Sequence, residues 1–173
     1  MTDGLLLPPG AGRDIPGVDM TLKVGAERSR QWSVFEARVA PGFDVGAHLH
    51  HHAEEMFYIL EGELDLLAFH PRDEAEGDWR AWESDSGASV FRGGPGSFMH
   101  VPTGCPHAFF NPGPMPARML FVVAPSGHED YMREMAELVT AGGGPPDQAA
   151  IAALRARHDI HQLTSFGRRP LPG

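Results

Sequence analysis

The chain has little cysteine and little positive charge. Its 173 residues include one cysteine, Cys105, which cannot form an intrachain disulfide, so no disulfide framework stabilises the fold. Lysine and arginine number 14 against 23 aspartates and glutamates, giving a formal net charge of −9. A chain this acidic does not attract nucleic acid through its overall field, and we expect no nucleic-acid partner.

Long apolar runs are also missing. No stretch approaches the roughly 20 apolar residues that a membrane-spanning helix needs. The N-terminus has neither the basic start nor the apolar run of a secretory signal. We therefore expect no membrane partner and a cytoplasmic location.

Glycine and proline, in contrast, are plentiful, at 21 and 16 residues. Both residue types favour turns, so the composition favours short strands over long helices. Alternating or β-branched runs predict strands at residues 20–24, 31–40, 56–60, 64–69, 96–101, 107–111 and 118–123. Short strands at this spacing predict an all-β sandwich or barrel.

The pattern changes near the C-terminus. Residues 129–139 have helical spacing, and Asp147 can cap a second helix with Ile151 and Leu154 on one face. We predict one domain, 1–173, made of an N-terminal arm (1–30), a β barrel (31–125) with a hairpin or loop inserted at about 70–95, and a helical extension (126–173). Trp79 and Trp82 of the insertion are expected to pack on the body or to line an entrance.

Possible metal ligands are concentrated in residues 48–55, which hold four histidines and two glutamates. Imidazole and carboxylate together favour a divalent transition metal. His48 and His50 are two apart and point to the same side of a strand. Glu55 reaches that side only if a turn or bulge breaks the alternation. His107, which follows a Pro/Gly turn, would come from a neighbouring strand.

Three imidazoles and one carboxylate leave one or two coordination positions open, which is typical of catalytic metal sites. The carboxylate of Glu55 can also act as a base. The simpler alternative is a surface histidine run that binds metal by accident. We expect His51 and His52 to be exposed or outside the ligand set, and we expect five further histidines not to be ligands: His70, His100, His128, His158 and His161.

These residues resemble the two sequence motifs of the cupin superfamily. The first motif is matched, at every fixed position, by Gly42, His48, His50, Glu55 and Gly62, and the second by Gly96, Pro102, Gly104, His107 and Asn111. Each motif occurs once, so the chain resembles a monocupin. The resemblance implies a cupin barrel (a double-stranded β-helix or jelly roll) followed here by two short helices. It implies one divalent transition metal (Fe, Mn, Ni, Co, Cu or Zn), with His48, His50, Glu55 and His107 as ligands.

The C-terminal part resembles, more loosely, that of bacterial quercetinase-like cupins, related to quercetin 2,3-dioxygenase. Those proteins use a divalent metal and O2 to open a flavonol ring, and the resemblance implies Glu55 as the catalytic base. The hypothesis is therefore a metal-dependent dioxygenase acting on an aromatic or enolisable small molecule. Side chains expected to line its substrate pocket are Phe35, Phe57, Ile59, Met99, Phe109 and Phe121.

Two other functions stay open. One is an O2-independent isomerase, cyclase or decarboxylase of secondary metabolism, in which the metal is a Lewis acid. The other is a cupin that binds a small molecule without turning it over. For all three functions we expect a homodimer, because edge strands need cover and cupin relatives commonly pair through them.

Overall fold

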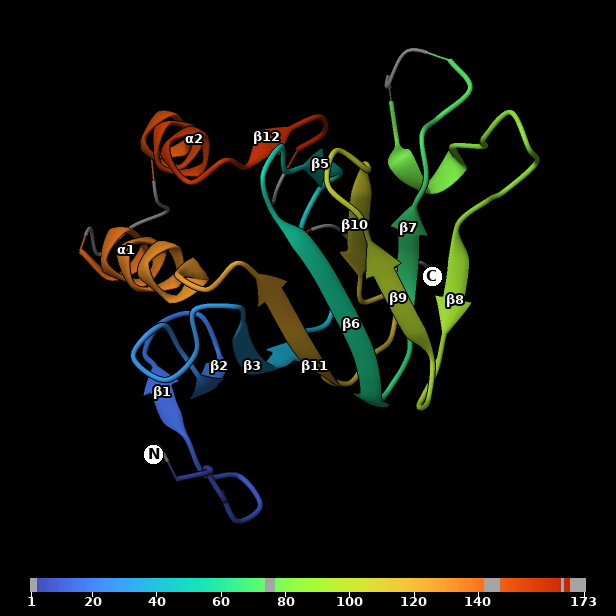
Figure 1. Ribbon diagram of the computed structural model, residues 1–173. Helices are drawn as coiled ribbons and strands as arrows, with labels where there is room; N and C mark the ends of the chain where they lie inside the picture. The colour runs from blue at the N-terminus through green and yellow to red at the C-terminus, as the bar shows by residue number, and fades with distance from the viewer. Residues whose placement is uncertain (1–2, 74–76, 142–146, 166, 169–173) are drawn as a thin grey trace.

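Two β-sheets face each other and enclose the main hydrophobic core (Figure 1). A computed structural model describes residues 3–73, 77–141, 147–165 and 167–168. The first sheet has the strand order β1-β2-β3-β11-β6-β9, with bounds Arg13–Ile15 (β1), Met20–Val24 (β2), Ser33–Val39 (β3), Ala117–Ala124 (β11), Glu54–Glu61 (β6) and Phe98–Val101 (β9). The second has the order β12-β5-β10-β4-β13, with bounds His161–Gln162 (β12), His48–Leu49 (β5), His107–Phe110 (β10), Phe43–Asp44 (β4) and Gly167–Arg168 (β13). β7 (Leu64–Ala68) pairs with β10, and β8 (Phe91–Gly93) pairs with β7.

The first sheet follows the two-residue period that the sequence predicted. Along β11, every second side chain is buried and the intervening ones are partly exposed. Phe121 of β11 lies opposite Phe35 of β3 on one side and Phe57 of β6 on the other. Because successive side chains of a strand point to opposite faces, this register gathers the aromatic residues on the inner face of the sheet.

The second sheet is covered on both faces where β10 crosses it, and all four β10 residues are buried. His107 lies in the metal-ligand cluster and Phe109 in the main core, whereas Ala108 and Phe110 belong to a second cluster with Trp79 and Trp82. The insertion therefore packs on the outside of the barrel. Of the two expectations for its tryptophans, packing on the body is the one that the structure shows. Within it lie a short 3-10 helix, η1 (Trp79–Ala81), and an isolated bridge between Glu83 and Ser89.

Two helices follow the barrel, as expected. They are α1 (His128–Thr140) and α2 (Gln148–Arg157), and they lie together beside one end of the sheets (Figure 1). Oδ1 of Asp147 accepts a hydrogen bond of 2.9 Å from the backbone of Ala149, which caps α2 as predicted. Ile151 and Leu154 of α2 share one hydrophobic cluster with the barrel interior. The helices thus pack directly on the barrel core. Neither has the length and apolarity of a membrane span.

The all-β barrel with two short helices is confirmed, but the sequence pattern missed several short pairings. In the expected arm (1–30), for which one strand at 20–24 was predicted, residues 13–24 form the hairpin of β1 and β2. β2 pairs with β3 and so joins the first sheet. After α2 the chain returns to the barrel, where β12 pairs with β5. This return brings the C-terminal segment next to the first histidine of the ligand-rich run.

Candidate metal centre

Four predicted ligands from three strands and a turn meet inside the barrel. His48 of β5 lies opposite His107 of β10, and His50 follows β5 directly. The chain then turns, and β6 begins with Glu54 exposed and Glu55 buried. This is the break in alternation that the sequence required. One ligand atom from each of His48, His50, Glu55 and His107 lies within 4.8 Å of the others.

The burial of this cluster is nearly complete. The exposed fractions are 5% for His48, 3% for His50, 2% for Glu55 and 0% for His107. Polar groups buried this deeply are costly unless they are paired or bind a metal. The cluster is therefore not an accidental histidine run on the surface, unlike the neighbouring His51 and His52, which are exposed.

Backbone carbonyl groups orient all three imidazoles. Nδ1 of His48 lies 2.8 Å from the carbonyl oxygen of Gly46, and Nδ1 of His107 lies 3.1 Å from that of Cys105. Nδ1 of His50 lies 2.9 Å from the carbonyl oxygen of Asp159, in the loop after α2. A carbonyl can only accept, so each Nδ1 carries the proton. In the neutral rings the lone pair is then on Nε2, where a metal would bind it.

The Nε2 atoms of His50 and His107 face the Glu55 carboxylate. Nε2 of His50 lies 3.1 Å from one Glu55 oxygen and Nε2 of His107 lies 2.9 Å from the other. Both Nε2 atoms are buried and, as neutral acceptors, have no donor as hydrogen-bond partner. Lone pairs directed at a carboxylate need a cation between them, either a proton or a metal ion. Three nitrogens and one oxygen suit a divalent transition metal, so the residues present fit the group.

The protonation states agree with this assignment. Burial lowers the pKa of His48 well below its usual value, and the nearby charges of His107 and Arg155 lower it further, so His48 is neutral. Burial would raise the pKa of Glu55, but the charges and hydrogen bonds of His107 and His50 hold it well below its usual range. Burial likewise opposes protonation of His50, but the hydrogen bond to Glu55 raises its pKa overall. Without metal, a proton therefore bridges Glu55 and an imidazole.

Comparison with known proteins places the fold and the motifs in one family. The family model described as Cupin matches residues 21–135, about two thirds of the chain. The chain is a cupin. No curated protein matches it.

Solved structures resembling this cupin are distant in sequence. An uncharacterised double-stranded β-helix protein of Klebsiella pneumoniae is 18% identical, with a TM-score of 0.46 over 62% of this chain and 76% of that one. An RmlC-like cupin of Shewanella frigidimarina is 16% identical, with a TM-score of 0.47 over 68% and 85%. A putative sugar phosphate isomerase of Acidithiobacillus ferrooxidans is 21% identical, with a TM-score of 0.44 over 62% and 60%.

The six residues expected to line a substrate pocket are all buried in the main core of the cupin. Phe57 stacks on Phe121, with ring centroids 4.9 Å apart, and its ring centroid lies 6.4 Å from that of His107. Phe109 packs against Phe57, and Phe35 stacks on Phe121. The remaining two, Ile59 and Met99, belong to the same cluster. An aromatic wall therefore adjoins the ligand cluster, while its contact with a substrate stays a prediction.

The first turn of α1 adds two residues that the sequence did not point to. The His128 ring lies 6.3 Å from that of His50 and 5.4 Å from that of Phe121, and Tyr131 packs on it at 5.1 Å. Burial lowers the pKa of His128 to about 4, so the ring is neutral near pH 7. His128 is not among the four clustered ligands. Its ring lies next to that of His50, and no spacing in the sequence predicts this contact.

Asp159 connects the C-terminal loop to the histidine run. Besides the carbonyl that holds His50, its carboxylate accepts the backbone N–H of His52 at 2.8 Å and lies 3.0 Å from Nε2 of His161. Burial would raise the pKa of Asp159, but these hydrogen bonds lower it to about 2. Asp159 thus fixes the turn between β5 and β6 from outside the barrel.

The motif residues that bind no metal shape the ends of the strands. Nδ2 of Asn111 donates to the carbonyls of Val39 and Met115 at 2.8 and 2.9 Å, and its Oδ1 accepts from the backbone of Gly113 at 2.8 Å. At Gly62, where φ is 76°, a Cβ would lie 2.9 Å from Cα of Ala117, so only glycine fits.

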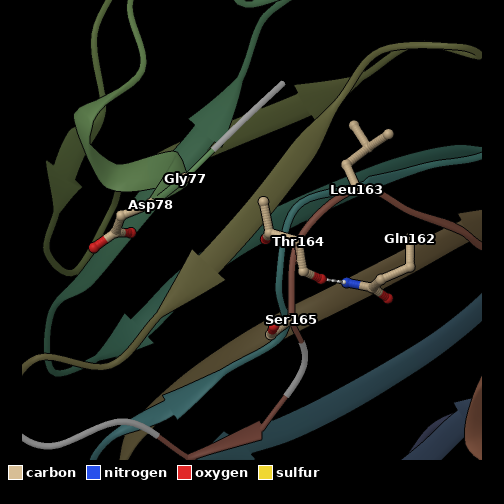
Figure 2. Close-up of a pocket in the computed structure, with 6 residues that line it drawn as sticks. All are labelled: Gly77, Asp78, Gln162, Leu163, Thr164 and Ser165. Atoms are coloured by element: carbon tan, nitrogen blue, oxygen red, sulfur yellow. Dashed lines mark hydrogen bonds between the residues drawn. The ribbon is translucent and has the colours of Figure 1, made fainter. Parts of the chain in front are cut away.

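A surface hollow of about 580 Å³ is lined by Gly77, Asp78, Gln162, Leu163, Thr164 and Ser165. Figure 2 shows these six residues. The side-chain amide of Gln162 donates to the Thr164 carbonyl at 2.6 Å, and Asp78 forms an ion pair with Arg80. No ligand of the buried cluster lines this hollow, so it is no part of the candidate metal centre.

Proposed function

We propose that this cupin is a metal-dependent dioxygenase acting on an aromatic or enolisable small molecule. The observation that supports this is the buried set of three imidazoles and one carboxylate beside a wall of stacked aromatic rings, with Nε2 of His50 and of His107 directed at Glu55. A divalent transition metal held by His48, His50, Glu55 and His107 would supply a Lewis acid and, if redox-active, a centre for reaction with O2.

The residues of the chain have separate roles in this scheme. Glu55 is the only carboxylate of the cluster, so it accepts the proton of the substrate hydroxyl through a carboxylate oxygen. The imidazoles would not compete for this proton, because their Nδ1 atoms already carry protons held by carbonyls and their Nε2 atoms would be bound to the metal. Phe57 and Phe121 contact the substrate ring, and the packing of α1 on the barrel keeps bulk water away from the carboxylate.

The test measures metal content and O2 consumption together. Untagged protein is analysed for metal, reconstituted with Fe, Mn, Co, Ni or Cu, and assayed for O2 uptake with flavonols and related enols. We expect uptake in the wild type and its loss in His48→Ala and Glu55→Gln. His100→Ala is the matched control, since His100 lies on β9 and is exposed. Uptake that persists in both ligand variants contradicts the proposal.

The same assay separates the two alternatives. Turnover under strict anaerobiosis would favour an isomerase, cyclase or decarboxylase that uses the metal as a Lewis acid. Saturable binding of a small molecule with no product, in air or under nitrogen, would favour a binding cupin.

A further inference from the structure

One of the three imidazoles is held by a residue far away in the chain. The Nδ1 atoms of His48 and His107 lie 2.8 and 3.1 Å from carbonyl oxygens two residues before them. His50 uses instead the carbonyl of Asp159, which is 109 residues away in the chain and lies at 2.9 Å. The orientation of His50 therefore depends on how the loop after α2 docks on the barrel.

This loop continues into residues 159–165, here called the C-terminal strap, which contain β12 and lie beside β5 (Figure 1). The backbone N–H groups of Leu163 and Thr164 donate to the carbonyl of Ala47 at 2.8 and 3.1 Å. The backbone N–H of Ala47 donates to Oγ1 of Thr164 at 2.8 Å. A Cβ at Gly46 would lie 2.8 Å from the carbonyl oxygen of Thr164, closer than packed atoms allow. The strap thus packs tightly on the residues that lead into the first ligand.

Asp159 attaches the start of the strap at two points. Its carbonyl holds His50, and its carboxylate accepts the backbone N–H of His52 at 2.8 Å and lies 3.0 Å from Nε2 of His161. The backbone at Asp159 is left-handed, with a φ of 58°, and among the described non-glycine residues only Asp19 shares a positive φ. Aspartate and asparagine tolerate this region better than other side chains, because they can bond to the local backbone. The residue type therefore suits both attachments.

We propose that Asp159 is a positioning residue of the metal centre. Its left-handed backbone and its carboxylate hold in place the carbonyl that orients His50, so the affinity for metal depends on the docked C-terminal strap. A partner at the second ring nitrogen fixes the orientation of a ligand imidazole and raises its basicity. Without that partner the ring rotates, and its Nε2 no longer points steadily at the other ligands. The inference rests on the proposed function only through the bound metal.

The first measurement is zinc affinity, by competition with a chromophoric chelator. Loss of such a partner typically weakens metal binding about 10–100-fold, and we expect this loss in Asp159→Ala, since alanine avoids the left-handed region and has no carboxylate. Asp159→Asn keeps the backbone tolerance and an oxygen acceptor for His52, so it should restore the wild-type affinity. Asp19→Ala is the matched control, because it puts the same substitution at a φ of 50° in the turn between β1 and β2. It should bind zinc as the wild type does.

The second measurement reports the ligand rings themselves. In cobalt(II)-loaded protein, the Nδ1 protons of bound imidazoles give strongly shifted proton NMR signals when their exchange with water is slow. Three rings held by carbonyls predict three such signals in the wild type. Asp159→Ala should lose one of them, and Asp19→Ala should keep all three. A loss of overall stability would not remove one signal selectively.

Asp159→Gly covers the case in which Asp159→Ala does not fold. Glycine adopts a φ of 58° without strain, so only the carboxylate is lost, and we expect a smaller loss of zinc affinity and faster exchange of one signal. Fewer than three signals in the wild type, or unchanged zinc affinity in both Asp159→Ala and Asp159→Gly, overturns the inference. An equal loss of affinity in Asp19→Ala overturns it too, because backbone strain would then explain the effect.

The outcome is separable from that of the proposed function, because zinc and cobalt binding need no turnover. Zinc affinity that depends on Asp159, without O2 uptake by any redox metal form, would support the positioning role and overturn the dioxygenase alone. Failure of the wild type to bind zinc or cobalt would overturn the metal site and the premise of this inference with it.

Discussion

Metal binding should raise the thermal stability of this cupin by a measurable amount. The unfolded chain has no preformed site, so a metal binds the folded state and stabilises it. At a free metal concentration 100 times Kd, the gain is about 2.7 kcal/mol. For a chain of this length, 1 kcal/mol corresponds to roughly 2–4 °C in Tm. The expected rise is therefore about 5–11 °C.

The rise should depend on the buried ligands. In His107→Ala the cluster loses its most buried imidazole, which is 0% exposed, and we expect most of the shift to disappear. His100→Ala is a control for a lost exposed histidine. The double variant His51→Ala/His52→Ala removes the exposed part of the run and should keep the full shift. Thermal melts followed by circular dichroism, with and without Mn, Ni or Zn, give the values.

The opposite pattern would refute the assignment. If His107→Ala kept the shift while the double variant lost it, metal would be bound by the exposed run on the turn between β5 and β6. The carbonyl-anchored imidazoles would then be structural, and Glu55 would pair with a protonated ring in every state of the protein.

Three further predictions concern pH and stability, and a fourth concerns assembly. Metal affinity should fall in titrations as the pH falls through the pKa of His50, because His50 must lose a proton before Nε2 can bind metal. Burial would lower this pKa, but the hydrogen bond to Glu55 raises it above its usual value. Asn111→Ala should lower the free energy of unfolding in urea by about 2–3 kcal/mol, because two carbonyls lose their donor. Glu129→Gln should cost about 1–3 kcal/mol, whereas Glu137→Gln on the exposed face of α1 should cost little. Burial would raise the pKa of Glu129, but hydrogen bonds lower it overall. The stability that Glu129 contributes is therefore present above its pKa in the unfolded chain and is lost as the pH falls through its pKa in the folded protein. Glu129→Gln should lack this loss of stability in acid. Light scattering at tens of micromolar should report a dimer, as proposed from the need to cover edge strands, and a monomer there would count against it.

The strands that could be predicted are those whose burial has a period of two. In β3, β6 and β11 one face is buried in the core and the other faces outward, so apolar and more polar residues alternate along their sequences. β4, β5, β12 and β13 have two residues each, and so short a segment carries no period. Their existence depends on partners far away in the chain, as in the pairing of Gln162 with His48.

The four candidate ligands could be predicted because they stand in two compact motifs with fixed spacing. The groups that surround them could not. Arg155 follows a helix pattern in which a charged residue is expected to face solvent, and only the docking of α2 on the barrel buries it. Asp159 acts on His50 through its carbonyl oxygen, a group that every residue has, so side-chain chemistry gives no signal.

The site is thus built from two parts of the chain with different tasks. The barrel supplies the ligands, and the C-terminal segment supplies the carbonyl that orients His50, the neutral His128 and the charge of Arg155. Loss of a ligand and loss of a surrounding group should therefore have different effects on metal binding. Arg155→Met should retain one zinc per chain, because it removes no ligand. His107→Ala should lose the zinc, because it removes one of the four ligands.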